Sequence, residues 1–311
     1  MELRALSHYD NDFDTRFGDC IMLFDSTVLV VYDCGHVKHA EAVEAFLSAH
    51  PQISEVNIVV SHNDSDHTDG VITLLDYLCA KTKITVTVYS SLYLKSARKV
   101  KDLLDDDRRT LPATKQHILD TFNNIKDIIE KAQECKFAVK NVDVGTKIAS
   151  CYVVGPTEDE FVGVVSKAIK DNHVTQIEGE TVMNAASVQL KCTLGETTVL
   201  LCGDATPEYL PDDLDSYDIF QLPHHGKLDN AKGIFDKLHD PYSKKYLVSD
   251  NTGSAETSGG SDDLTKYMET EHYTAAYNTH NSVVNLPKHV TKSAETPSQQ
   301  GRAYYGDLGS V

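Results

Sequence analysis

The sequence lacks any run of apolar residues long enough to cross a membrane. A spanning helix needs roughly 18 consecutive apolar residues, and no segment of the 311-residue chain reaches that length. The segment Met1–Asp19 is polar and acidic, without the basic start and apolar stretch of an export signal. We therefore expect no membrane association and a cytoplasmic location.

Cysteine pairs of the C-x-x-C kind are also missing. The seven cysteines are an odd number, and four of them lie in or beside apolar runs. We expect reduced, mostly buried thiols, and we assign none of them to a metal.

Positive charge is scarce, because 29 lysines and arginines stand against 47 acidic residues and leave a net charge of −18. Such a surface repels a polyanion, which argues against sequence-independent DNA binding through a basic face. It does not exclude a nuclease, since a metal centre inverts the local field. The charge favours a small substrate, a short nucleic-acid end or a basic partner protein.

Short apolar runs indicate an α/β protein. Strands are predicted at Asp19–Phe24, Thr27–Tyr32, Val56–Ser61, Ile84–Tyr89, Lys147–Gly155, Ser187–Thr193, Thr197–Cys202, Tyr217–Leu222 and Tyr246–Ser249. Helical spacing is found in His39–His50 and Gly70–Leu78. Turns at Asp25-Ser26 and Gly195-Glu196 predict one hairpin in each half. The two halves therefore suggest a duplicated layout with one sheet from each.

The segment Ser90–Lys136 is charged and helical in its periodicity, with Pro112 after the run Asp105–Arg109. We predict two helices around a break, forming either an insertion that covers the site or a solvated pair. Asn251–Asp262 is predicted to be a loop, and the chain after about Leu286 a loose polar tail. One domain at residues 1–285, an insertion at about 90–138 and a tail at 286–311 follow from this division.

Four potential metal ligands lie close together just after a buried strand. They are His62, Asp64, Asp66 and His67. Imidazole and carboxylate together suit Zn²⁺, Mn²⁺ or Fe²⁺. An acidic surface loop with incidental histidines is the alternative, but the ligand density at a strand end favours a metal site.

Two later strand ends carry further candidates. Asp204 follows Gly203 at the end of an apolar strand, where one carboxylate can bridge two metals, although Gly-Asp is more often a turn. His224 and His225 follow the next strand. Adjacent side chains point in different directions, so at most one of these histidines is expected to bind metal. The other can hold a substrate oxygen or donate a proton.

The run Ser61-His62-x-Asp64-x-Asp66-His67-x-x-Gly70 resembles the metal signature of the metallo-β-lactamase superfamily, in its variant with Asp at the second His position. The chain further resembles a stand-alone form of the hydrolase domain of ComEC-type DNA-uptake proteins. The shared motifs, in order, are Gly18-Asp19-Cys20, Asp33-Cys34-Gly35, the His/Asp cluster, Asn184-Ala185-Ala186-Ser187, Leu201–Asp204 and His224-His225-Gly226.

This resemblance implies a four-layer αββα metallo-β-lactamase sandwich with a helical insertion and metals at its edge. It places His62 and Asp64 at a first metal, Asp66 and His67 at a second, and Asp204 between them. Asp33 would tie the loops together behind the ligands.

The chain also departs from the family pattern. The third histidine of the first site is missing, with Asn184 or Ser187 near its place and His173 further upstream, and Thr257–Ser261 lacks the late Gly-His-Pro. The late ligand is therefore either missing or replaced by His224 or His225. We assign His224 to the metal and His225 to catalysis, and we predict one or two Zn or Mn ions.

The predicted function is metal-dependent hydrolysis. A bound metal lowers the pKa of a water molecule to about 7, Asp66 would steer or deprotonate that water, and His225 would act as an acid. The resemblance favours a phosphodiesterase or nuclease acting on a nucleotide-type substrate or a nucleic-acid end. The alternatives are a hydrolase of a lactone, thioester or amide, and a catalytically weak module that binds a protein partner.

Overall fold

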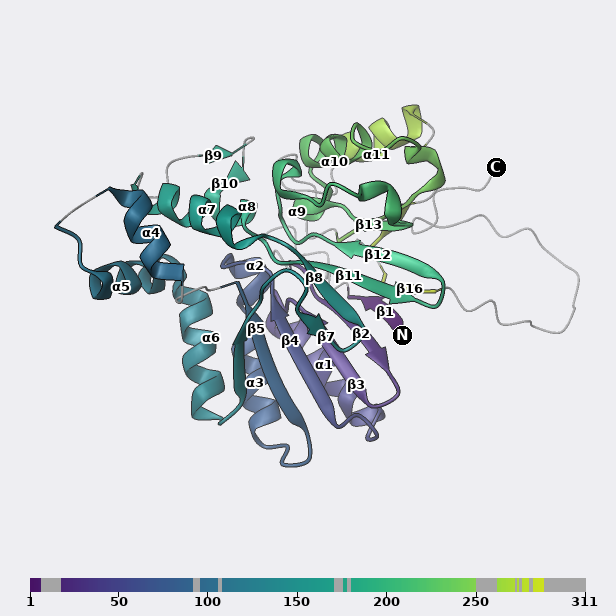
Figure 1. Ribbon diagram of the computed structural model, residues 1–311. Helices are drawn as coiled ribbons and strands as arrows, with labels where there is room; N and C mark the ends of the chain where they lie inside the picture. The colour runs from purple at the N-terminus through teal and green to yellow at the C-terminus, as the bar shows by residue number, and fades with distance from the viewer. Residues whose placement is uncertain are drawn as a thin grey trace, which may run out of the picture.

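The computed structural model describes residues 1–6, 18–91, 96–105, 108–170, 176–177, 180–249, 262–271, 273, 276–279 and 282–287. Two seven-stranded sheets lie face to face, with helices on their outer faces (Figure 1). The predicted four-layer αββα sandwich is confirmed. The predicted loop at Asn251–Asp262, apart from its last residue, and the predicted tail beyond residue 287 lie outside the described residues.

The first sheet comes from the N-terminal half and one late strand. Its order is β16 (Val284–Leu286), β1 (Glu2–Ala5), β2 (Ile21–Asp25), β3 (Val28–Tyr32), β4 (Glu55–Val60), β5 (Thr85–Ser90) and β6 (Ala138–Asn141). The pairs from β16 to β3 are antiparallel, and those from β3 to β6 are parallel. The predicted hairpin around Ser26 is present, and Ser26 takes a left-handed backbone conformation there.

The second sheet comes from the C-terminal half. Its order is β15 (Ala276–Asn278), β14 (Lys245–Val248), β13 (Ile219–Gln221), β12 (Thr197–Leu201), β11 (Gln189–Leu194), β8 (Cys151–Gly155) and β7 (Lys147–Ile148). Strands β12 to β15 are parallel, and β7, β8, β11 and β12 are antiparallel. Lys147–Gly155, predicted as one strand, is a tight hairpin because Ala149 turns the chain with a positive φ. A separate two-stranded ladder joins β9 (Gln176–Ile177) and β10 (Glu180–Thr181).

Helices cover both sheets. They are α1 (Val37–Ala49), α2 (Ser65–Thr68), α3 (Val71–Cys79), α4 (Ala97–Leu104), α5 (Leu111–Thr121), α6 (Asn123–Glu134), α7 (Glu158–Lys170), α8 (Val182–Ala185), α9 (Pro223–Gly226), α10 (Leu228–Phe235) and α11 (Asp262–Thr270). Single 3₁₀ turns occur at Pro207–Tyr209, Leu214–Ser216 and Pro241–Ser243. Among the described helices, none is long and apolar enough to span a bilayer.

Three apolar cores separate the four layers. The outer face of the first sheet packs against α1, α3 and α6. Side chains on this face include Val31, Ile58 and Val88. Their neighbours Tyr32 and Val59 face the other way and meet side chains of the second sheet. A third core lies between the second sheet and α10–α11. Because successive side chains point to opposite faces of a strand, each sheet has one apolar face packed against the other sheet and one packed against helices.

The described residues of the insertion form three helices rather than the two that we predicted. A break does separate α4 from α5, but Pro112 is not part of it, because Pro112 lies in the first turn of α5 after the Thr110 cap. Proline is tolerated there, since the first turn needs no intrahelical N–H bond. The missed break lies at Phe122, between α5 and α6. Its buried ring stacks near Phe161 at 5.7 Å between centroids.

Candidate metal centre

The candidate residues follow the carboxyl ends of parallel strands that meet at one edge of the sandwich. Asp33 follows β3, and the His/Asp cluster follows β4. From the second sheet, Asp204 follows β12 and His225 follows β13. Carboxyl ends of neighbouring parallel strands lie side by side, so four separate chain segments converge there.

His62, His67 and Asp204 form a fully buried group. One ligand atom from each lies within 4.8 Å of the others. His67 Nε2 is 3.3 Å from Asp204 Oδ1, and His62 Nε2 is 3.8 Å from Asp204 Oδ2. The Nε2 atoms of both histidines and Oδ1 of Asp204 are buried without a hydrogen-bond partner.

This geometry fits a metal ion. Buried polar atoms without partners are costly, and a cation placed between them would satisfy all three. Ligand bonds of about 2.0–2.1 Å in a tetrahedral site put neighbouring ligand atoms about 3.3–3.4 Å apart. The observed separations of 3.3 and 3.8 Å are close to that value.

The outer nitrogens of the two histidines are held by protein groups. His67 Nδ1 lies 2.8 Å from Asp33 Oδ2, and His62 Nδ1 lies 2.9 Å from Ser61 Oγ. The Ser61 amide donates to Asp33 Oδ1 at 2.7 Å. Donation from Nδ1 leaves Nε2 as the lone-pair nitrogen that faces the centre. Asp33 thus takes the tying role that the sequence resemblance implies.

His225 and Asp66 form a second, adjoining group. His225 Nε2 lies 3.1 Å from Asp66 Oδ2 and 4.0 Å from Asp204 Oδ2. The His225 ring is 5.3 Å from that of His67, between centroids. Both groups therefore share Asp204, which lies between them as a bridging ligand would.

Asp19 is the residue that sequence reasoning missed. It is fully buried, and its Oδ1 lies 2.9 Å from His225 Nδ1. Its Oδ2 accepts from Gln221 Nε2 at 2.6 Å and from Ser249 Oγ at 2.9 Å. Asp19 can also join His67 and His225 in a three-ligand group. Its only sequence signal was the Gly-Asp pair in the first of the resemblance motifs.

His224 and His225 point in different directions, as predicted. Their ring planes meet at 86°, and both residues have left-handed backbone angles, with φ of 50° and 55°. Such angles cost about 1–2 kcal/mol per residue, a cost typical of functional sites. The His225 side chain is 1% exposed, whereas that of His224 is 21% exposed, with Nδ1 4.0 Å from Asp204 Oδ2.

Two close approaches fix the position of Asp204. Gly203 has a φ of +53°, and a Cβ there would lie 2.9 Å from Cβ of Ser61 and 3.0 Å from the Tyr32 hydroxyl. The Asp204 amide donates to Ser187 Oγ at 3.2 Å. Ser187, one of the two residues near the place of the missing histidine, therefore supports the backbone of Asp204.

The buried charges polarise one another. Burial lowers the pKa of His67, but the carboxylates of Asp204 and Asp33 outweigh burial and raise that pKa well above its ordinary value. Burial would raise the pKa of Asp204, yet the imidazoles of His67 and His225 hold it well below its usual range. The pKa of Asp66 is also lowered, because the hydrogen bond from His225 overcomes burial. Without a bound ion, these carboxylates and imidazoles hold one another in their charged forms, and a bound cation would take the place of the imidazole protons.

The remaining predicted residue lies at the rim. The Asp64 side chain is 40% exposed, and its Oδ2 is 3.8 Å from His62 Nε2. His173 and Thr257–Ser261 lie outside the described residues. The ligand assignments for His62, Asp64, Asp66, His67, Asp204 and His224 remain predictions, and the burial of His225 favours it over His224 as the late ligand.

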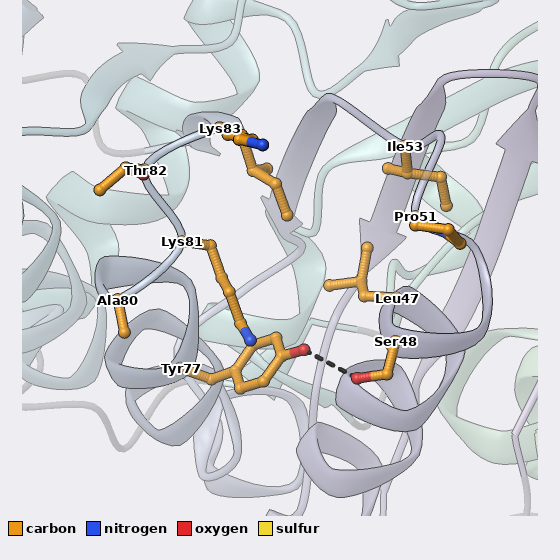
Figure 2. Close-up of a pocket in the computed structure, with 10 residues that line it drawn as sticks. Leu47, Ser48, Pro51, Ile53, Tyr77, Ala80, Lys81, Thr82 and Lys83 are labelled. Atoms are coloured by element: carbon orange, nitrogen blue, oxygen red, sulfur yellow. Dashed lines mark hydrogen bonds between the residues drawn. The ribbon is translucent and has the colours of Figure 1, made fainter.

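A surface pocket lies at the opposite end of the first sheet. Figure 2 shows Tyr77, whose hydroxyl is 3.1 Å from Ser48 Oγ, and Lys81, whose Nζ lies 4.3 Å from the centre of the Tyr77 ring. Ile53 and Ile84 line it just before β4 and β5 begin. Its ten lining residues, all in the described part of the chain, include no histidine, cysteine or carboxylate.

Comparison with known proteins gives distant structural likenesses. The chain is similar to the metallo-beta-lactamase fold protein YhfI from Bacillus subtilis, with 11% identity over 92% of this chain and 100% of that one, at a TM-score of 0.48. It is similar to a long form RNase Z from yeast, with 12% identity over 91% of this chain and 41% of that one, at a TM-score of 0.42. A putative metallo-beta-lactamase from Thermotoga maritima has 13% identity over 65% of this chain and 76% of that one, at 0.33.

No family profile and no curated protein sequence matches the chain. Fold alone does not define an activity. The fold class therefore rests on the four layers of this chain, and the chemistry on its own side chains.

Proposed function

We propose that this chain, an αββα sandwich of the metallo-β-lactamase fold, is a metal-dependent hydrolase. One observation carries the proposal: the Nε2 atoms of His62 and His67 and Oδ1 of Asp204 are buried without hydrogen-bond partners and lie beside one another. Asp33 and Ser61 occupy the outer nitrogens of both histidines, which prepares the inner nitrogens for a cation.

With two ions bound, the ligand set would divide into two positions that share Asp204, with His62 and Asp64 at the first and His67, Asp66 and His225 at the second. A single ion would instead lie between His62, His67 and Asp204. This set of nitrogen and oxygen ligands suits Zn²⁺ or Mn²⁺, in one or two ions. His225 takes the ligand role that the sequence suggested for His224, because it is buried and within 4.0 Å of Asp204.

A divalent ion bound there supplies charge neutralisation and a water molecule of lowered pKa. With an ion held there, Asp66 would steer the attacking water and take up its proton, because its side chain lies at the edge of the centre and is 24% exposed. His224 lies on the open side and would donate a proton to the leaving group, a role that its 21% exposure allows. Asp19 holds the His225 ring in place through Nδ1.

For the substrate we propose a phosphodiester of the nucleotide type or at a nucleic-acid end. The support is the motif series shared with the ComEC-type hydrolase domain, from Gly18-Asp19-Cys20 to His224-His225-Gly226. The net charge of −18 disfavours long duplexes, which require a basic face, and leaves small or short substrates.

The test measures bound metal and hydrolysis of bis-p-nitrophenyl phosphate with added Mn²⁺ or Zn²⁺. His62→Ala should lose metal and turnover, while His239→Ala, whose side chain is 93% exposed, should keep both. Metal-dependent cleavage of p-nitrophenyl esters or thioesters without phosphodiester cleavage would assign the other substrate class. A wild-type protein without stoichiometric metal would overturn the enzyme proposal in favour of a partner-binding module.

A further inference from the structure

Helix α6 of the insertion begins without a side-chain cap of its own. Its N-cap residue is Phe122, which makes no capping hydrogen bond. The first four N–H groups of a helix have no partner within the helix, and a cap normally accepts from the second or third of them. In α6, the third amide belongs to Ile125, and it donates to Asn63 Oδ1 at 3.1 Å.

Asn63 therefore supplies, from a distant loop, the capping hydrogen bond of a helix that begins sixty residues later. It lies between the candidate ligands His62 and Asp64, and it is 8% exposed. Its side-chain amide donates to Asn123 Oδ1 at 3.1 Å. Both polar ends of this side chain are thus bound to the first turn of α6.

A second contact fastens the backbone of the same loop. Asn124 Nδ2 donates to the Asn63 carbonyl at 2.7 Å and lies 3.4 Å from Thr68 Oγ1. Thr68 Oγ1 in turn donates to the Asp64 carbonyl at 2.9 Å. The loop that carries His62 and Asp64 is consequently bound to α6 on both sides of Asp64.

The two halves of the centre have different supports. His67 is held by Asp33, and His225 by Asp19, at buried contacts of 2.8 and 2.9 Å. Asp64 is at the rim with a 40% exposed side chain, so its position depends chiefly on the loop backbone. That backbone is the part that α6 holds.

We propose that Asn63 is a positioning residue of the metal centre, and that α6 holds the His62–Asp64 loop in its ligating conformation. This inference rests on the proposed function and deepens it, because it makes the helical insertion a working part of the centre. The sequence left two interpretations of the insertion open, a cover and a solvated helical pair. The Asn63 contacts assign α6 a third role, as a support of the metal loop.

The test separates a metal-positioning role from simple helix capping. Asn63→Ala removes the cap of α6 beside the metal loop. Thr110→Ala is the control in the same insertion, because it removes the cap of α5, where Thr110 Oγ1 accepts from the Ala113 amide at 3.3 Å. Metal affinity of each purified full-length protein is measured by competition with a chromophoric chelator, alongside Tm. Both variants should lower Tm, but only Asn63→Ala should raise the metal Kd, by about 10- to 100-fold.

Two further results sharpen the outcome. Asn63→Asp keeps the acceptor for the Ile125 amide and should restore most of the metal affinity, since Asp is as good a cap as Asn. Saturating metal should return the kcat of Asn63→Ala to the wild-type value, because the ligands themselves are unchanged.

Asn63→Ala with a wild-type metal Kd and a lowered Tm, like Thr110→Ala, would overturn the positioning role and leave the hydrolase proposal standing. A wild-type protein that binds no metal would overturn both. If Asn63→Ala does not fold, Asn124→Ala removes the backbone contact and keeps the cap, and it should raise the metal Kd in the same direction.

Discussion

Replacing Asp33 with Asn changes which nitrogen of His67 carries the proton. Asp33 Oδ1 accepts from the Ser61 amide at 2.7 Å, and this contact can only be kept by the oxygen of an Asn side chain. The Asn amide nitrogen then faces His67 Nδ1, which must accept rather than donate. The proton moves to Nε2, which faces Asp204 Oδ1 at 3.3 Å and can no longer bind a metal.

The expected loss of metal affinity can be calculated from the role of Asp33, whose carboxylate holds the outer nitrogen of the candidate ligand His67. Removing such a partner weakens metal binding by about 10- to 100-fold. Metal at about 100 times the wild-type Kd stabilises the folded state by about 2.7 kcal/mol, and a 100-fold weaker Kd leaves about 0.4 kcal/mol. With about 2.1 cal/mol/K of unfolding entropy per residue over 311 residues, the lost stabilisation amounts to about 3–4 °C in Tm.

The assay is the rise in Tm on adding Zn²⁺ or Mn²⁺, with each variant compared with its own metal-free form. This difference removes any effect of the substitution on the metal-free protein. Asp25→Asn is the matched control, because Asp25 is exposed at the end of the neighbouring strand β2. A metal-induced rise in Asp33→Asn equal to that of the wild type would refute the tautomer argument and the ligand role of His67 Nε2.

The remaining predictions concern the scaffold around the centre. Gly203→Ala should destabilise the protein by about 1–3 kcal/mol more than Gly145→Ala in urea unfolding. Both glycines have positive φ, but a Cβ at Gly203 meets Ser61 at 2.9 Å whereas one at Gly145 meets nothing within 4 Å. Equal losses of stability in the two glycine variants would show that the Ser61 side chain moves aside freely. Phe220→Ala should cost about 3–5 kcal/mol because its ring is fully buried. Tyr242→Ala, at a half-exposed side chain, is its control. An equally small loss of stability in both variants would contradict the packing of the third core.

The sequence predicts the place of a candidate residue best where that residue follows a strong strand. Val56–Ser61 is an apolar run, and the dense cluster after it could be placed at a sheet edge without any long-range information. Asp204 follows the equally clear strand β12. Because parallel strands bring their carboxyl ends to one edge, local patterns were enough for these residues.

Residues joined only by the tertiary fold could not be found in this way. Asp19, Gln221 and Ser249 meet through contacts that span more than 200 positions of the chain, and none belongs to a local pattern of ligands. Asn63 caps a helix whose start the sequence did not reveal, since α5 and α6 were predicted as one element. Strands β1 and β16 have four and three residues, too few for a clear alternation. Helix α7 was missed although its apolar spacing was visible.

The pairing of β1 with β16 joins segments that are made far apart in time, because most of the described chain lies between them. Leu3 lies opposite Leu286, and Ala5 lies opposite Val284. Chains are synthesised at about 5–20 residues per second, so roughly 15–50 s pass between completion of β2 and arrival of β16. During that interval the outer edge of β1 presents unpaired N–H and C=O groups, which can template pairing with another chain. Strand β16 therefore covers this edge, and its pairing with β1 removes the exposed groups through which two copies of the chain could pair.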